Sequence, residues 1–341
     1  MPTFRTGEVR GILSERAGIQ RVSVLLDGAA EPSKAYCLTD LIGDTAVGDR
    51  VVCNTTAVEL GLGTGGWHVV HWNLSRPEFV TPGPDHVMKL RYTSLQADVG
   101  TSELAHPDIP ETLDGTPVVV CQLHSQVGVV AAAIAALRPG TRVAYVMTDG
   151  ASLPIALSDL VEDLRVRDLL HSTVTAGHAF GGDLEAVTVA SGMLLARHVA
   201  GADVLIVGMG PGVVGTGTKY GTTAIEAAAL LDTVDALDGV PVLCVRASDG
   251  DGRDRHQGVS HHTMTAIELT RSAPVVAAVP HEVLTIEGVV AAEVDPPDVA
   301  AILAAANLRI TTMGRGIDAD PLFFAAALAA GGILATMGDG T

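Results

Sequence analysis

Aromatic residues are scarce in this chain of 341 residues, because phenylalanine, tryptophan and tyrosine together make up only 3% of it. Proteins that bind single-stranded nucleic acid stack bases on aromatic side chains, so the composition disfavours that function class. Positive charge is also scarce, with 21 Lys and Arg against 39 Asp and Glu and a net charge of −18. An acidic surface repels phosphate backbones and anionic lipids, and we therefore expect neither a nucleic-acid partner nor a membrane partner.

Only four cysteines are present, and no two of them are closely spaced (Cys37, Cys53, Cys121 and Cys244). Each stands in or next to an apolar run, which predicts small buried side chains in a reducing compartment. Long apolar runs are missing as well: residues 321–337 are rich in Ala and Gly and shorter than the ~20 strongly apolar residues of a membrane span. The N-terminus carries no apolar signal core. The sequence therefore predicts a cytoplasmic protein in which residues 321–337 form a buried helix.

The first 80 residues have the pattern of β structure. Their apolar-rich runs are short and alternate with turn residues, at 9–13, 20–26, 34–38, 49–54 and 67–72. Short strands at this spacing are typical of a small barrel of the SH3-like or the oligonucleotide-binding type. Five prolines between residues 76 and 111 prevent long helices, so we expect residues 81–116 to form a connector with one short strand near 88–95.

From residue 117 onward, apolar strands alternate with helical segments. The predicted strands are 118–123, 142–147, 171–176, 203–208, 241–246 and 274–279. The predicted helices are 127–137, 153–165, 184–199, 224–237 and 262–271, followed by a helix at 297–306, a strand at 308–312 and a closing helix. This alternation indicates βαβ units. We therefore expect a small N-terminal β-barrel (1–80) and a large α/β domain (117–341) with a mostly parallel sheet covered by helices on both faces.

A glycine-rich loop follows the strand at 203–208. Glycine backbone can approach a ligand closely and aim N–H groups at it, and hydroxyl and ammonium donors follow. We expect the loop to bind the anionic part of a small, phosphorylated metabolite. The binding residues expected in it are Gly210, Gly212, Gly215, Gly217, Thr218 and Lys219.

The segment 210–215 also matches the G-x-G-x-x-G fingerprint, which leaves an NAD(P)-dependent oxidoreductase as an alternative. The match is incomplete, because Thr223 and Glu226 form a capping-box pattern that begins the next helix near residue 224, outside the fingerprint. The acidic residue expected about 20 positions later is absent from the end of the next strand. A glycine-rich connection required only by tight packing is the third possibility.

In a parallel sheet the loops that follow the strands emerge at one edge, where ligands bind. Here these loops carry, in chain order, His124, Asp149, His178, Arg253, Arg255, His261 and His262. We expect the four histidines to act as general acids and bases. The two arginines are expected to clamp the anion bidentately, with Asp149 as a further ligand-binding residue.

Two helix starts bear on these candidates. Asp183 is expected to cap a helix that begins at residue 184, with Glu185 in its first turn. Ser260 is expected to cap the helix predicted at 262–271. The neighbouring His261 and His262 should then point to different sides and seldom act together.

A metal site could be assembled from His124, His178, Asp183 and either His261 or His262. No short ligand spacing supports such a site, so we predict no metal, and no cofactor is assigned.

Four segments resemble a family of functionally uncharacterised bacterial proteins of similar length, found mainly in Gram-positive lineages. They are VGDRVVCNTTAVELGLGTGG (47–66), GHAFGGDLEA (177–186), GMGPGVVGTGTKYG (208–221) and GVSHHT (258–263). The resemblance covers nearly the whole chain and implies a cytoplasmic protein without an established activity, so it assigns no role to any residue. An enzyme acting on a small anionic metabolite is our preferred hypothesis, and a non-catalytic ligand-sensing regulatory or scaffold protein is an alternative. The acidic, Ala- and Gly-rich composition suits a homodimer.

Overall fold

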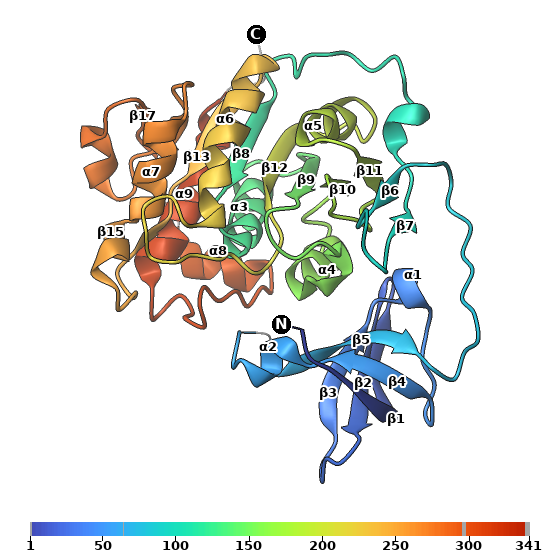
Figure 1. The fold of residues 1–341 in the computed structure, drawn as a ribbon. Coiled ribbons are helices and arrows are strands. Elements are labelled where there is room, and N and C mark those ends of the chain that lie inside the picture. Colours follow the sequence, from blue (N-terminus) through green and yellow to red (C-terminus); the bar gives the residue numbers. More distant parts are fainter. Residues whose placement is uncertain (1, 64, 295–297, 338–341) are drawn as a thin grey trace. The chain divides into compact units, whose positions relative to one another are not determined.

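The structure is a computed structural model, and it describes residues 2–63, 65–294 and 298–337. The chain divides into two compact units, residues 1–100 and 101–341 (Figure 1). The boundary between them falls inside the proline-containing segment 81–116 that the sequence marks as a connector. Each unit has its own hydrophobic core.

The first unit contains the predicted barrel, which is confirmed as a closed barrel of five strands. The strands follow the order β1-β2-β3-β5-β4 and comprise β1 (Phe4–Arg16), β2 (Ile19–Leu26), β3 (Ser33–Cys37), β4 (Arg50–Asn54) and β5 (Trp67–Asn73). The short helices α1 (Thr39–Ile42) and α2 (Thr56–Glu59) connect them. Alternate side chains such as Val22, Val24 and Val51 point inward and are fully buried, because successive residues of a strand face opposite sides.

Between residues 74 and 116 the elements are short, as the prolines predict. Of the single strand expected near 88–95, only its start is formed, as β6 (Met88–Lys89), and it pairs with a second short strand, β7 (Ala97–Asp98). One turn of 3-10 helix, Ser102–Leu104, follows.

The second unit is built on a sheet of eight strands, all of them parallel where they pair. Its order is β11-β10-β9-β12-β8-β13-β16-β17. The bounds are β8 (Pro117–Cys121), β9 (Val143–Thr148), β10 (Ser172–Ala176), β11 (Leu184–Ala186), β12 (Val204–Met209), β13 (Val240–Cys244), β16 (Val275–Ala277) and β17 (Val290–Ala292). Six of these strands lie where the sequence predicts them. Central strands such as β9 and β12 are buried along their whole length, which is why they read as continuous apolar runs.

Helices cover both faces of this sheet (Figure 1). One face packs on α3 (His124–Leu137), α4 (Asp159–Val166), α8 (Val299–Ala305) and α9 (Pro321–Thr336). The other packs on α5 (Val189–His198), α6 (Glu226–Ala236) and α7 (His261–Leu269). Along β8 the side chains alternate accordingly, with Val119 on the α3 face and Val120 on the α6 face.

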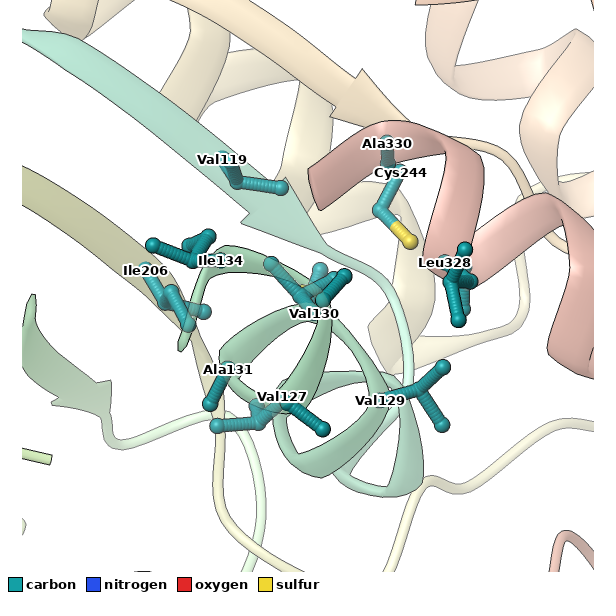
Figure 2. Packing of buried hydrophobic residues seen from close by; sticks show 14 of the residues in the cluster. Val119, Val127, Val129, Val130, Ala131, Ile134, Ile206, Cys244, Leu328 and Ala330 are labelled. Carbon is teal, nitrogen blue, oxygen red and sulfur yellow. The ribbon is translucent and has the colours of Figure 1, made fainter. Parts of the chain in front are cut away.

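Helix α3 is buried against the sheet and, on another side, against α9, which packs on the same face of the sheet. Its Val127, Val130 and Ile134 lie among side chains of the strands on one side, and Leu328 of α9 lies on the other (Figure 2). The two helices touch at Gly331, where a Cβ would come within 2.7 Å of the Cβ of Ala133. Glycine therefore permits the close approach. The predicted closing helix at 321–337 is thus confirmed as a buried element, α9, and among the described helices none is both long and apolar enough to cross a membrane.

The helix predicted at 184–199 is wrong at its start. Residues 184–186 form the short edge strand β11, and α5 begins only at Val189, capped by Thr188, whose Oγ1 accepts a hydrogen bond from the Ser191 N–H at 3.2 Å. Asp183 is therefore no helix cap. Its carboxylate instead binds Nη1 of Arg165 at 2.7 Å. A strand of three residues is too short to leave a period-two pattern that sequence reasoning can detect.

Two related predictions also need correction. Glu185 lies in β11 and not in a first helical turn, and its carboxylate accepts a hydrogen bond from Thr175 Oγ1 at 2.8 Å. The strand predicted at 308–312 is wrong, because this segment is a loop. Its apolar pattern has another origin: the side chains of Leu308 and Ile310 are buried in the core although the backbone that carries them is a loop.

Candidate functional site

The carboxyl ends of five neighbouring strands share one edge of the sheet, in the order β10-β9-β12-β8-β13. The alternation of strands and helices in the sequence predicts this shared edge. The chain leaves β8 toward α3 on one face and leaves the adjacent β12 toward α6 on the other, and such a reversal opens a crevice between strand ends. Polar residues gather there in two groups. We call them the carboxylate cluster (Thr148, Asp149, His178 and Glu226) and the arginine–histidine cluster (Arg246, His256, His261 and His262).

The arginine–histidine cluster is formed by the loop that follows β13. Two short strands, β14 (Ala247–Ser248) and β15 (Gly258–Val259), pair antiparallel and fold this loop back on itself. As a result the N–H of Ser260 donates to the backbone oxygen of Arg246 at 2.8 Å. Ser260 also caps α7 as predicted, since its Oγ accepts a hydrogen bond from the His262 N–H at 3.3 Å. The end of β13 and the start of α7 are thereby held together.

The three histidine rings of the cluster lie against one another. The ring centroids of His261 and His262 are 4.2 Å apart. The ring centroid of His256 lies 5.0 Å from that of His261 and 4.9 Å from that of His262. The expectation that His261 and His262 point to different sides is therefore wrong. The folded-back loop supplies His256 at the end of a short 3-10 helix, Asp254–His256, and its ring packs on both. The sequence carries no signal for this contact of His256.

Arg246 is the buried cation of the cluster, with an exposed fraction of 5%. Its Nη1 donates to Nδ1 of His262 at 2.8 Å. Among the described residues, none of the carboxylates forms an ion pair with it. Burial, and after it the charge of Arg253, lowers the pKa of Arg246 to about 10. The guanidinium still carries its charge at neutral pH.

Two of the neighbouring arginines, in contrast, are neutralised. Arg253 binds both carboxylate oxygens of Asp251, at 2.8 Å and 2.6 Å, and holds the pKa of that carboxyl well below its usual range. Arg315 binds Asp320 at 2.9 Å and approaches Asp251 at 3.4 Å. Within the part of the chain that the structure describes, Arg246 is thus a buried arginine without a carboxylate partner, whereas the neighbouring Arg255 is exposed to solvent.

The imidazoles of the cluster are neutral at physiological pH. Burial and the adjacent Arg246 lower the pKa of His256 to about 4 and that of His262 to about 3. Burial, followed by Arg255, also lowers the pKa of His261. A guanidinium can only donate, so Nδ1 of His262 is an acceptor and its hydrogen lies on Nε2.

Two buried nitrogens at this edge have no hydrogen-bond partner among the described residues, Nε2 of Gln122 and Nε2 of His261. Gln122 is fully buried at the end of β8, and its Oε1 accepts from Thr263 Oγ1 at 2.6 Å. The same hydroxyl accepts from the N–H of Arg246 at 3.0 Å, so the Gln122 amide lies against the first turn of α7 and the arginine. A buried donor without a partner costs free energy, and a site that keeps one calls for a ligand. A polar residue directly after an apolar strand was the available signal for Gln122, and sequence reasoning missed it.

The carboxylate cluster surrounds Glu226, the first residue of α6. Its Oε1 accepts a hydrogen bond from Thr148 Oγ1 at 2.7 Å, and its Oε2 occupies the space that a Cβ on Gly150 would need. Burial, and to a smaller extent the charge of Asp149, raises the pKa of Glu226 to about 7. The carboxylate of Asp149 accepts from the backbone N–H of His178 at 3.0 Å. This brings together two predicted residues and Glu226, which sequence reasoning took for a capping residue.

The glycine loop runs from β12 to α6 and folds on itself. Gly215 and Thr222 form an isolated antiparallel bridge, so no helix begins within the fingerprint. At Gly210 a Cβ would lie 2.7 Å from the backbone oxygen of Ser152, and Gly212 has a φ of +107°. Glycine is required at both positions for reasons of backbone geometry. The predicted capping box is replaced by one turn of 3-10 helix, with Thr222 as its cap.

The polar residues of the glycine loop are engaged within the protein. Lys219 forms an exposed ion pair with Glu268 of α7. The hydroxyl of Thr218 lies 2.9 Å from another threonine hydroxyl of the loop. At Gly217, where φ is +83°, a Cβ would lie 3.7 Å from the guanidinium carbon of Arg255. The loop therefore approaches Arg255, the residue before His256 of the arginine–histidine cluster, at Gly217.

His124 lies at the same edge of the sheet, but its side chain makes its contacts inside the protein. Its Nε2 is 2.6 Å from Ser158 Oγ, and its Nδ1 is 3.3 Å from both the Met209 oxygen and the Tyr145 hydroxyl. Burial lowers the pKa of His124 to about 4. We interpret it as a residue that joins the starts of α3 and α4 to the end of β12. The metal set considered around His124 and His178 is not formed; among the described residues, the side chains that converge as potential metal ligands are the three histidines of the cluster.

No curated protein matches the chain. A family model described as a protein of unknown function (DUF3866) matches residues 34–331, which is nearly the whole chain, as the resemblance of its motifs implies. The chain therefore belongs to the DUF3866 family of proteins of unknown function.

Proposed function

We propose that the protein is an enzyme that acts on a small anionic metabolite and binds the anionic group at the arginine–histidine cluster. The observation that supports this most directly is Arg246, a buried guanidinium whose hydrogen-bond partner among the described residues is a neutral imidazole and not a carboxylate. Burying a charge without a counter-ion is costly, and an incoming anion removes that cost. Binding of the anion is therefore favourable, because the anion supplies the counter-ion that the buried guanidinium lacks.

Other donors around Arg246 suit the same ligand. The start of α7, a helix of nine residues, supplies the positive end of a helix dipole, which favours anions. The fully buried Gln122 has an amide nitrogen without a partner beside this first turn. A phosphate group offers several acceptor oxygens, and a guanidinium can bind two of them at once. We therefore favour a phosphorylated metabolite over a carboxylate.

The carboxylate cluster supplies proton transfer in this proposal. Glu226 has a pKa near neutrality, which is the range in which a general acid or base is most effective. In the sheet, β12 and β8 separate β9 from β13, and neighbouring strands are about 4.8 Å apart, so the two clusters are about 14 Å apart at the backbone. A substrate bound at Arg246 must therefore extend along the edge to bring its reacting atom to Glu226 and His178.

Thermal unfolding in the presence of anions tests the anion site. Inorganic phosphate, sugar phosphates and nucleotides should raise the Tm of the wild-type protein, since a ligand that binds only the folded state stabilises it by mass action. Chloride at the same ionic strength serves as the reference. Arg246→Gln should abolish the response and should raise the Tm of the ligand-free protein, because it removes an unpaired buried charge.

Two control variants sharpen this experiment. Arg142→Gln removes an exposed arginine paired with Asp203, and it should leave the anion response unchanged. Lys219→Ala should also leave it unchanged, since Lys219 is paired with Glu268. A response that survives in Arg246→Gln, or one that is lost in Lys219→Ala, would place the anion elsewhere.

The oxidoreductase alternative has less support, because the glycine loop folds on itself and does not lead directly into a helix. Titration of NADH and NADPH, followed by their fluorescence, decides it.

The non-catalytic sensor keeps the anion site and differs only in the role of Glu226. Anion binding that persists in Glu226→Gln, with no turnover of any bound metabolite by the wild type, favours the sensor.

A further inference from the structure

We infer that the imidazoles of His256, His261 and His262 bind one divalent metal ion of the zinc class beside the proposed anion site. The metal site stands on its own geometry. Its coupling to the anion, argued below, rests on the proposed function. Zinc, cobalt and nickel share the preference for neutral imidazole ligands, and the chemistry named here is common to them.

The geometry is that of three ligands around one point. One ring nitrogen from each histidine lies within 4.8 Å of the other two. A tetrahedral zinc ion with Zn–N distances of about 2.0–2.1 Å needs ligand nitrogens about 3.3 Å apart, which small side-chain rotations can achieve. Three protein ligands also leave a fourth position open, and that is the arrangement of catalytic rather than structural zinc sites.

Two rings are already prepared for this role. Nδ1 of His256 lies 2.7 Å from the hydroxyl of the fully buried Ser260, and this contact leaves Nε2 of His256 free to act as a ligand. Hydrogen bonds of this kind fix the orientation of metal-bound histidines. Nε2 of His261 is buried and has no hydrogen-bond partner in the described structure. A buried imidazole nitrogen without a partner, in a ring that packs against two other imidazoles, is explained by an ion between the rings.

The third ring couples the metal to the anion. In the metal-free cluster Nδ1 of His262 accepts a hydrogen bond from Arg246. A neutral His262 that binds metal through Nε2 carries its hydrogen on Nδ1, so Arg246 must leave the ring. The freed guanidinium and the metal charge then face the same space, and an anion in the open fourth position neutralises both. The metal and the anion should therefore strengthen each other's binding, and this coupling is reciprocal.

Metal analysis of the full chain tests the site directly. The protein is purified without a histidine tag, treated with a chelator and titrated with Co²⁺, whose visible absorption intensifies in tetrahedral nitrogen sites. We expect one equivalent of Co²⁺ per chain, displaced by one equivalent of Zn²⁺. His261→Ala should weaken binding at least about tenfold. The matched control is His281→Ala, which removes an exposed histidine from the 3-10 helix His281–Thr285 and should change nothing.

A second titration, in the presence of inorganic phosphate, tests the coupling. Phosphate should tighten Co²⁺ binding about fivefold or more, and Arg246→Gln should remove this effect while Co²⁺ binding itself persists. Failure to bind one equivalent of metal, or equal binding by His261→Ala, overturns the metal site.

The outcomes separate the two proposals. Phosphate binding by the chelator-treated protein, lost in Arg246→Gln, upholds the anion site when the metal is absent. Stoichiometric metal binding without any phosphate response upholds the metal and removes the anion site. Far-UV circular dichroism of His261→Ala shows whether the variant folds, and His261→Gln, of similar polarity and size, replaces it if it does not.

Discussion

At the scale of single residues, the environment of Glu226 changes what a common helix-start residue can do. An acidic side chain in the first turn of a helix is favoured by the helix dipole alone. Here burial outweighs that effect, because the carboxylate lies between Thr148 and the backbone of Gly150 and faces the like charge of Asp149. Its pKa of about 7 therefore lies well above the ordinary value of 4.5. A raised pKa means that the folded protein holds this proton more tightly than the unfolded chain does.

Glu226→Gln should make stability less dependent on pH. Because the folded pKa is raised, the stabilisation that Glu226 provides is complete below pH 4.5 and is lost as the pH rises through about 7. The variant should therefore gain about 1–3 kcal/mol relative to wild type between pH 5 and pH 8. Urea unfolding of both proteins at the two pH values measures the difference. An equal difference at both pH values contradicts the raised pKa.

At the scale of elements, the start of α5 shows how a short strand displaces a helix boundary. Residues 184–186 join the sheet as β11, and only then does Thr188 cap the helix. Asp183 is of a residue type that often caps helices, but its carboxylate forms an ion pair with Arg165. Pairing with β10 decides between the two structures, and that pairing is a tertiary contact.

Thr188→Ala should destabilise the protein by about 1 kcal/mol, because it leaves a backbone N–H of the first turn of α5 without its acceptor. Thr188→Ser keeps the hydroxyl and should remain within a few tenths of a kcal/mol of wild type. Chemical denaturation measures both variants. Equal stability of the alanine and serine variants would show that the cap contributes nothing.

At the scale of the whole molecule, the chain has separate hydrophobic cores. The barrel core includes Ile42 and is enclosed within the first unit. The second unit has one core on each face of its sheet, and Leu328 of α9 belongs to the one that surrounds α3 (Figure 2). Each unit therefore buries enough apolar surface to define its own unfolding transition.

Truncation of a core side chain should affect one unit only. Ile42→Ala and Leu328→Ala should each cost about 2–5 kcal/mol, since each leaves a cavity in a close-packed core. Differential scanning calorimetry of the full chain should show two transitions, with Ile42→Ala lowering one and Leu328→Ala lowering the other. A single transition that both substitutions lower would show that the units unfold together.

Much of the architecture followed from the sequence alone, because it is encoded in local patterns. Alternating apolar residues predicted the barrel strands, and continuous apolar runs separated by helices predicted the parallel sheet. From this parallel arrangement the sequence also predicted that His178 and His261 lie on loops at one edge. The cap of α7 at Ser260 was predicted because its signal spans only a few residues.

The order of the strands, in contrast, was decided only by the tertiary structure. Strand β12 inserts between β8 and β9, and β13 pairs on the other side of β8, although the chain visits them in a different order. This order sets Gln122 beside Arg246 and brings Glu226 to Thr148, so both clusters depend on it. No local periodicity specifies which strands become neighbours, because that choice depends on how whole helices and strands pack together.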